Sequence, residues 1–272
     1  QARSRSKYHD SLHSKPMSKK IILNKNKSTA AIACCLTPLI LGFVIPLFRL
    51  MSWAWISRDK ASALVSIEMI SNSLGLSIIS SISIVLIALL LVFTSRYFNS
   101  YVINFSNRLA TLGYSIPGAV IAIGILLFTA QINVVTNFVL TGSLVLLVFA
   151  YIVRYLAVAC QPINAGIETN CDSLNNASKS LGSSTYTSLR LVNIPLIKNT
   201  LITAGLLVFI DIIKELPLTL ILRPFNFETL STATFDLSSQ AQIIEASLPA
   251  LCMIAVVLVP LVYLNYRLDN SR

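Results

Sequence analysis

The sequence predicts an all-α membrane protein with six transmembrane helices, and three observations support this fold class. The chain is 55% hydrophobic and only 12% charged, whereas soluble domains carry about a quarter charged residues. Its mean hydropathy is +0.74. Its apolar residues are gathered into runs of roughly 20 residues, the length at which a helix crosses a hydrocarbon core. The composition therefore excludes an ordinary soluble domain.

Six apolar runs account for most of the chain. The spans are expected at 30–56, 74–93, 109–129, 138–159, 197–222 and 248–266. We treat the first span as an element of its own and 64–267 as the core, because a short charged stretch at 58–60 separates the two. The third span contains Gly113, Gly118 and Gly124. Small residues allow helices to approach closely in lipid, so we expect tight packing there.

The basic residues predict how the spans are oriented. Eight of the 21 Lys and Arg residues lie in the first 27 positions, and eight more fall on the same side of the expected spans, against four on the opposite side. The positive-inside rule assigns the richer side to the cytoplasm. The same rule accounts for the net charge of +10, so no nucleic-acid partner is implied. Residues 1–29 are then a cytoplasmic segment, either a terminal tail or a linker between two halves of a longer chain.

A polar island between the fourth and fifth spans is interpreted as two short helices joined at a glycine. The first helix has apolar residues at helical spacing, namely Leu174, Ala177 and Leu181. Gly182 can adopt the left-handed conformation that ends such a helix. Ser183 or Ser184 can cap a second helix, which Pro195 is expected to stop. This elbow, within 160–198, is expected in the cytoplasm.

The elbow resembles the coupling loop of ABC importer permeases, which has the pattern Glu-Ala-Ala, three residues, Gly, nine residues, Ile, one residue, Leu-Pro. The matching positions here are Asn176, Ala177, Ser178, Gly182, Val192, Ile194 and Pro195. The spacing agrees throughout, but Asn176 replaces the acidic residue and Ser178 the second alanine. The resemblance implies a type I ABC importer permease fold, whose loop docks into an ATPase subunit and transmits its closure to the membrane helices. An ordinary amphipathic connector is the alternative.

The fifth span carries the concentrated charge within the apolar runs. Asp211 lies three residues before Lys214 and four before Glu215, so all three are expected on one side of a helix that continues to 222. Charges at this depth cost roughly 3 kcal/mol or more each when unpaired, and they must face protein or water. Two interpretations stay open. The three residues line a translocation pathway, or Lys214 neutralises a carboxylate within the bundle.

The string from Asp211 to Phe225 resembles a stretch of ferric-iron ABC permeases, as does the Gly-Tyr-x-x-Pro-Gly run at 113–118. This resemblance implies ferric iron as the cargo. Fe(III) is a hard cation that prefers oxygen ligands, so Asp211 and Glu215 are expected as transient contacts, with no metal site assigned. The acidic residues of the expected outer loop 226–246 suit a cationic cargo. Related permeases for polyamines, thiamine, sulfate or phosphonates share the elbow, so those cargoes stay open.

No catalytic constellation is visible in the sequence. It contains no Gly-x-x-x-x-Gly-Lys phosphate loop. Both histidines lie in the basic segment, and the five cysteines are scattered, which indicates free thiols. We therefore expect neither an enzymatic activity nor a cofactor, and the energy source is expected in a partner.

The resemblance implies several partners and a location in the bacterial inner membrane as a multi-pass protein. The expected partners are a dimer of cytoplasmic ABC ATPase subunits, a second permease half that is fused or separate, an extracytoplasmic substrate-binding protein and membrane lipid. A rival from another class is a secondary transporter in which the charges of the fifth span relay protons or sodium ions. Such a transporter has no need of the elbow. A membrane-embedded enzyme is disfavoured because no histidine lies in the expected spans.

Overall fold

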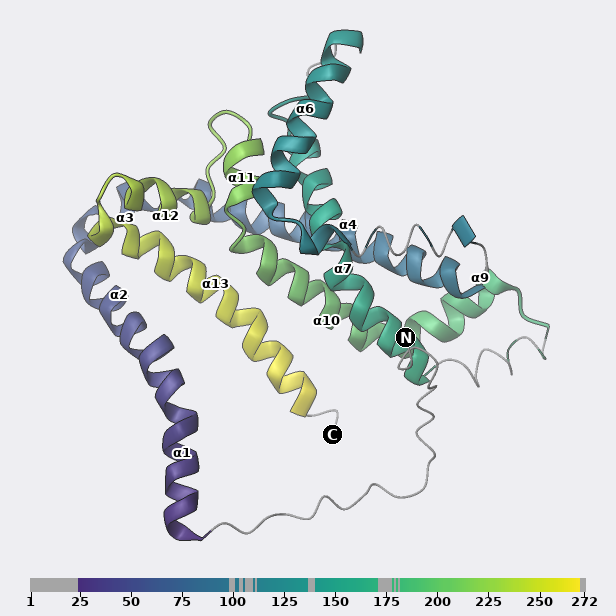
Figure 1. Cartoon of the computed structure of the whole chain (residues 1–272), viewed down its shortest axis with the longest axis horizontal. Coiled ribbons are helices and arrows are strands. Elements are labelled where there is room, and N and C mark those ends of the chain that lie inside the picture. Colours follow the sequence, from purple (N-terminus) through teal and green to yellow (C-terminus); the bar gives the residue numbers. More distant parts are fainter. Residues whose placement is uncertain are drawn as a thin grey trace. The chain divides into compact units, whose positions relative to one another are not determined.

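The computed structural model describes residues 24–269, except 98–100, 103–104, 106–109, 111, 137–139, 171–177, 179 and 181. The described residues form helices joined by short turns, with no strand among them (Figure 1). The chain divides into two units, 1–49 and 50–272. All-helical structure confirms the predicted fold class.

The first apolar run forms one long helix from Lys25 to Ile56. It consists of α1 (Lys25–Leu39), the π-helix η2 (Ile40–Val44) and α2 (Ile45–Ile56). The side chain of Asn24 caps its start by accepting a hydrogen bond from the Lys25 amide at 2.8 Å. The helix covers the whole of the expected span 30–56.

The second unit contains the remaining helices. In chain order they are η3 (Arg58–Lys60), α3 (Ala61–Leu64), α4 (Ile67–Tyr97), η4 (Gly113–Ser115), α6 (Gly118–Thr136), α7 (Leu144–Asn170), α9 (Thr185–Ser188), η5 (Leu189–Asn193), α10 (Ile194–Ile213), α11 (Pro217–Leu222), α12 (Leu230–Ser239) and α13 (Ile243–Asp269). Among the described residues of the whole chain, five helices are long and apolar enough to span a membrane, and a shorter apolar helix covers Gly118–Ile132. These six elements correspond to the six expected spans.

The core of the second unit lies where α4, α7 and α10 meet. Each of these three helices packs against the other two (Figure 1). The inner face of α7 is a buried stripe with a spacing of four residues, made of Leu147, Tyr151, Tyr155, Ala159 and Ile163. The facing stripe of α4 is built largely from small residues, including Ser77, Ser80 and Ala88. Small side chains let these helices approach closely where lipid provides no hydrophobic drive for association.

The outer face of α4 is apolar and exposed. Ile79, Ile82, Leu86 and Leu90 recur every three or four residues on the face opposite the core, and each is more than half exposed. Such a surface would be unfavourable in water but suits lipid or another apolar helix. The exposed apolar face thus agrees with a transmembrane protein.

Several helices extend beyond the apolar runs that predicted them. The second expected span, 74–93, lies within the longer α4; the fourth was expected at 138–159, but its helix, α7, begins later, at Leu144, and continues to Asn170. Hydropathy locates the part of a helix that lies in hydrocarbon. Backbone hydrogen bonding continues past that boundary wherever the sequence permits, so the elbow begins later than expected.

Two prolines place helix ends elsewhere than the sequence predicted. The third span was expected from 109, but Ile116 is extended ahead of Pro117 and α6 begins at Gly118. The fifth span was expected to continue to 222, but α10 ends at Ile213, four residues before Pro217. A proline ring clashes with the carbonyl four residues earlier, which explains that break. The expected outer loop 226–246 also contains a helix, α12.

Pro195 does not stop a helix, contrary to expectation. It lies in the first turn of α10, and the helix runs without a break from Tyr186 to Ile213. The five residues before α10 form the π-helix η5. This wider turn includes Leu191, whose carbonyl would meet the proline ring, so the chain passes the proline without breaking. The same arrangement recurs where η2 precedes Pro46.

Candidate functional site

The elbow turns at Gly182, as the sequence predicts. Gly182 has a φ of +79°, in the left-handed region that favours glycine. The Ser183 amide donates a hydrogen bond to the Ser178 carbonyl at 3.1 Å, which is the bond that closes a helix ending at such a glycine. On the other side, Ser184 Oγ accepts from the Thr187 amide at 3.2 Å and caps the second helix. The predicted turn at Gly182 and the predicted cap at Ser184 are both observed.

A buried bond between two hydroxyl groups holds the two sides of the elbow together. Ser178 Oγ and Ser188 Oγ lie 3.0 Å apart, and both residues are buried. Ser178 is the residue that stands in place of the second alanine of the coupling-loop pattern. The substitution therefore supplies a hydrogen bond across the turn. Asn176 and Ala177 of the same pattern lie outside the described residues.

The second half of the elbow exposes apolar side chains. Tyr186 and Leu191 are each 69% exposed. Of the remaining pattern residues, Val192 and Ile194 are half-buried and Pro195 is exposed. Apolar side chains exposed beside a rigid turn are a surface that a partner protein can cover.

The charged residues of the fifth span do not share one helix face. Lys214 follows the last residue of α10 and pairs with Asp211, with 2.8 Å between Nζ and Oδ1. The Lys214 side chain is 61% exposed and that of Asp211 18% exposed. Glu215 instead turns inward, and its side chain is 7% exposed. The helix break before Pro217 separates the two carboxylates, which a continuous helix would have kept together.

Glu215 is surrounded by groups from α7 that the sequence did not single out. Tyr155 donates its hydroxyl to Glu215 Oε2. Arg154 Nε lies 3.6 Å from the same oxygen, and the Arg154 side chain is 18% exposed. Arg154 lies well inside α7, beside the break.

The peptide at the break has its polar groups satisfied by neighbouring helices. The Glu215 carbonyl accepts from Thr219 Oγ1 at 2.7 Å and from Ser231 Oγ, on α12, at 3.1 Å. Thr219 Oγ1 also shares a 2.6 Å hydrogen bond with the buried Tyr151 hydroxyl. Side chains from α7, α11 and α12 thus meet at one broken turn.

Two of the three glycines that were predicted to allow close packing lie against other segments in this region. A Cβ on Gly113 would lie 1.9 Å from the Val153 carbonyl oxygen, and one on Gly118 would lie 2.2 Å from Arg154 Nη1 and 2.7 Å from Glu215 Oε1. Gly118 therefore leaves the space that the Arg154–Glu215 pair occupies. At Gly124 a Cβ would meet nothing within 4 Å among the described residues, so no close packing is observed there in this part of the chain.

The acidic residues of 226–246 are partly neutralised. Asp236 Oδ2 lies 3.2 Å from Arg223 Nη2, and Glu245 Oε1 lies 3.1 Å from Lys60 Nζ. Two of the three acidic side chains of this segment therefore have a basic partner, which weakens the case for an acidic rim that attracts cations.

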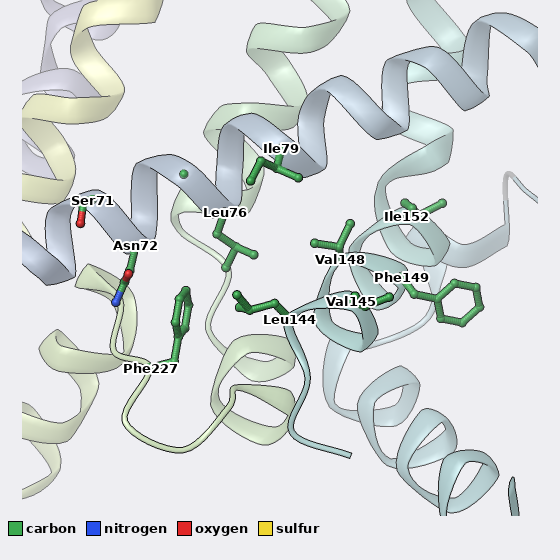
Figure 2. A pocket seen from close by; sticks show the side chains of 11 residues that line it. Ser71, Asn72, Leu76, Ile79, Leu144, Val145, Val148, Phe149, Ile152 and Phe227 are labelled. Atoms are coloured by element: carbon green, nitrogen blue, oxygen red, sulfur yellow. The ribbon is translucent and has the colours of Figure 1, made fainter. Parts of the chain in front are cut away.

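An apolar cavity of about 600 Å³ lies apart from the charged break, between α4, α7 and the segment before α12 (Figure 2). Leu76 and Ile79 face Val148 and Ile152 across it, and Phe227 lies at the end where Asn72 is found. None of its lining residues is charged. The cavity suits an acyl chain or an apolar helix rather than an ion. Among the described residues, no group of three or more His, Cys, Asp or Glu side chains could hold a metal ion.

A bundle of apolar helices with a rigid polar elbow and compensated charges at a helix break defines a membrane transport permease. The family model described as binding-protein-dependent transport system inner membrane component matches residues 84–271. The chain belongs to this family: it is an inner-membrane permease component of an ABC importer and a multi-pass membrane protein.

Relatives with curated descriptions point to more than one cargo. The chain is 29% identical over 218 residues to the Fe(3+)-transport system permease protein FbpB 2 of Haemophilus influenzae, covering 79% of this chain and 42% of that relative. It is 26% identical over 144 residues to the putative 2-aminoethylphosphonate transport system permease protein PhnV of Salmonella paratyphi A, covering 53% of each. The chain thus spans about half the length of these relatives.

Solved structures share the fold. A bacterial ABC transporter involved in the import of the acidic polysaccharide alginate matches with a TM-score of 0.67 at 15% identity, covering 89% of this chain and 96% of the matched chain. The same type of transporter in complex with an alginate pentasaccharide-bound periplasmic protein matches with a TM-score of 0.65 at 14% identity, covering 88% and 94%. At this identity the likeness establishes the fold alone.

Proposed function

We propose that the chain forms half of a translocation pathway and receives mechanical work from a separate ATP-hydrolysing subunit through the elbow. The observation that carries this proposal is the connection between the elbow and the charged break. A single helix runs from Tyr186 to Ile213 and ends one residue before Lys214. At 1.5 Å per residue it is a rod of roughly 40 Å. A push at the elbow therefore reaches the break without passing through a flexible joint.

The structure of the elbow allows it to transmit a displacement and to bind a partner protein. The Ser178–Ser188 hydrogen bond closes the turn across its two sides, so a displacement of one side moves the other. The exposed Tyr186 and Leu191 give an ATPase subunit an apolar surface to hold. In this proposal, the coupling loop includes Asn176, Ala177, Gly182, Val192, Ile194 and Pro195. Closure of an ATPase dimer would then switch the helices between inward-open and outward-open packings.

Ferric iron is the cargo that we propose first. The relative FbpB 2 is described as an Fe(3+)-transport permease. Asp211 supplies the carboxylate oxygens that a hard cation prefers, and it is paired with Lys214, whose side chain is 61% exposed. Its pairing with Lys214 would weaken cation binding. Weak binding is needed in a pathway that must release its cargo. We propose transient contact of the cargo with Asp211 and Lys214, while Glu215, whose side chain is 7% exposed, belongs to the same break without touching the cargo.

A phosphonate is the second candidate cargo, and one observation favours it. Lys214 is the most exposed charge at the break, at 61% of its side chain, and an ammonium group attracts an anion. The relative PhnV is described as a permease for 2-aminoethylphosphonate. The two cargoes are chemically distinct, one a trivalent cation and the other a zwitterion with an anionic phosphonate group, so transport measurements separate them directly.

The proposed assembly contains three further components. A substrate-binding protein would deliver cargo at the outer face; the alginate transporter was solved with a periplasmic protein of this kind. A second set of spans, fused or separate, would complete the pathway. The apolar outer face of α4 and the cavity beside it offer a surface for those spans or for lipid. No cofactor is proposed.

Reconstitution tests the proposal. The chain is co-expressed with the ATPase and binding protein that are expected to be encoded beside its gene, purified as a complex and placed in sealed vesicles. Uptake of radiolabelled Fe³⁺ and of radiolabelled 2-aminoethylphosphonate is then measured with and without ATP. We expect uptake of one cargo that requires ATP. Uptake driven by a proton or sodium gradient without ATP would instead identify the rival secondary transporter.

Labelling tests the location of the elbow. In a chain whose native cysteines are replaced by serine, Tyr186→Cys should react with an impermeant maleimide in inside-out vesicles only. Phe225→Cys is the matched control, because its native side chain is 94% exposed and lies on the expected outer side. It should react in right-side-out vesicles only. Reaction of both positions from the same side would refute the proposed topology.

A further inference from the structure

The Glu215 carboxylate is held from three directions inside the protein. Its Oε2 accepts from the Tyr155 hydroxyl and lies 3.6 Å from Arg154 Nε. Its Oε1 accepts from the Leu218 amide, in the first turn of α11, at 3.4 Å. With its side chain 7% exposed, this carboxylate has no open side on which to meet a cargo.

Arg154 links the break to a further segment. Its Nη1 donates to the Ile116 carbonyl, in the turn before α6, at 3.5 Å, and its guanidinium lies 5.6 Å from the centre of the Tyr155 ring. The guanidinium occupies the space left by the missing side chain of Gly118. One cation therefore connects α7, the start of α6 and the α10–α11 break.

The neighbouring Asp211–Lys214 pair is different in each of these respects. Its two members come from the same chain segment, three residues apart, and Lys214 is largely exposed. Among the described residues, this ion pair joins no second helix, and it is the Asp211 carbonyl, not the carboxylate, that accepts from the Tyr155 hydroxyl at 3.5 Å. The break thus has one ion pair that joins helices and another whose lysine is largely exposed.

We propose that Arg154 is a positioning residue, which holds Glu215 in the interior and thereby fixes the α10–α11 break, and that the cargo meets Asp211 and Lys214. This inference rests on the proposed transport function, which it deepens by dividing the charges of the break between two functions. Glu215 then affects transport through the shape of the break and not through contact with the cargo.

The two functions predict opposite behaviour when charges are removed. In a buried ion pair, removing one partner leaves an uncompensated charge, whereas removing both leaves none. If Arg154 positions Glu215, the double neutral variant should therefore transport better than either single variant. If Glu215 binds the cargo, the double variant can be no better than Glu215→Gln alone, because the ligand oxygen is still altered.

The experiment measures uptake by the complete complex in vesicles for Arg154→Gln, Glu215→Gln and the double variant, over a range of cargo concentrations. We expect each single variant to lower the maximal rate about tenfold or more without changing the half-saturating concentration. The double variant should return to within about threefold of the wild type. A double variant as slow as Glu215→Gln, or a half-saturating concentration raised about tenfold by Glu215→Gln, would overturn the proposal.

Two buried tyrosines provide matched controls. Tyr155→Phe removes the hydroxyl that reaches Glu215, whereas Tyr151→Phe removes a buried hydroxyl on the same helix that reaches Thr219 instead. The effect of Tyr155→Phe on the unfolding temperature should shrink in a Glu215→Gln background, and that of Tyr151→Phe should be unchanged. Equal behaviour of the two tyrosines would contradict a specific arrangement around Glu215.

Unfolding temperatures of the purified permease in detergent separate this inference from the proposed function. Absence of ATP-driven uptake by the wild type would refute the proposed function. The unfolding temperatures of the Arg154 and Glu215 single and double variants would still report the coupling between these two residues. A double variant that is more stable than both single variants, or that accumulates in membranes where they do not, supports the pair. Three variants that are equally unstable would overturn it.

Discussion

Two prolines at opposite ends of the same helix have opposite effects. Pro195 stands at the elbow and the helix continues past it, with a π-helical turn immediately before α10. Pro217 stands at the charged break, and there the helix ends four residues earlier and restarts as α11. The steric conflict between the proline ring and the preceding turn is the same in both places.

The surroundings explain the difference. At the break, the Glu215 carbonyl accepts hydrogen bonds from the Thr219 and Ser231 hydroxyls. The Glu215 carboxylate accepts one from the Leu218 amide. Neighbouring side chains thus replace the hydrogen bonds that an open turn loses. Pro195 itself is exposed, and a widened turn there keeps the bonding within the helix. A proline therefore breaks a membrane helix where other elements can satisfy the backbone.

The largest expected effect comes from filling the space beside the break. Gly118→Ala would place a Cβ 2.2 Å from Arg154 Nη1 and 2.7 Å from Glu215 Oε1, so one member of the ion pair must move. We expect a loss of about 3 kcal/mol of stability and most of the uptake. Gly124→Ala on the same helix has open space around it and should change stability by about 0.5 kcal/mol or less. Equal losses in thermal unfolding would show that the pair does not hold the break.

A smaller effect is expected from removing one hydrogen bond that supports the broken turn. Thr219→Val keeps the shape but leaves the buried Tyr151 hydroxyl and the Glu215 carbonyl each short of a partner. Such a loss costs about 2 kcal/mol. Thr203→Val is the matched control, since its hydroxyl bonds only to the Asn199 carbonyl of its own helix. Denaturation that does not distinguish the two variants would argue against support from neighbouring helices.

At the elbow we expect a modest loss of stability and a larger loss of coupling. At Gly182→Ala the added Cβ meets no atom of the described residues within 4 Å, so we assign its cost of about 1 kcal/mol to the positive φ. Gly142 has a φ of +73° and equally open space, which makes Gly142→Ala a control with the same strain. The two variants should unfold alike, but only Gly182→Ala should reduce ATP-driven uptake. Equal uptake would contradict the elbow as the coupling device.

The smallest effect is expected at the proline that does not break its helix. Pro195→Ala restores a backbone amide and lets the π-turn relax, so stability should change by about 0.5 kcal/mol or less. Pro46→Ala tests the same physics, because Pro46 also follows a π-helix. Thermal unfolding should give similar small shifts for both. A large loss at Pro195 would mean that the widened turn is itself required.

The sequence by itself determined the features that depend on neighbours along the chain. The apolar runs predict the spans, because the length of hydrocarbon to be crossed is fixed. Gly182 predicts the turn, because glycine readily adopts a positive φ. Ser184 predicts the cap, because a serine hydroxyl can accept from an unpaired amide at the start of a helix. Even Ser178 could be identified from spacing alone, although its bond to Ser188 could not.

Only the tertiary structure decided the arrangement at the charged break. The spacing of Asp211, Lys214 and Glu215 predicted a shared face, and it was misleading because the helix ends between them. Arg154 and Tyr155 are about sixty residues away in the chain, and no local pattern marks them as partners of Glu215. A buried charge is stabilised by whichever opposite charge packing brings within reach. That partner is determined by how α7 and the break pack together, and therefore by the fold.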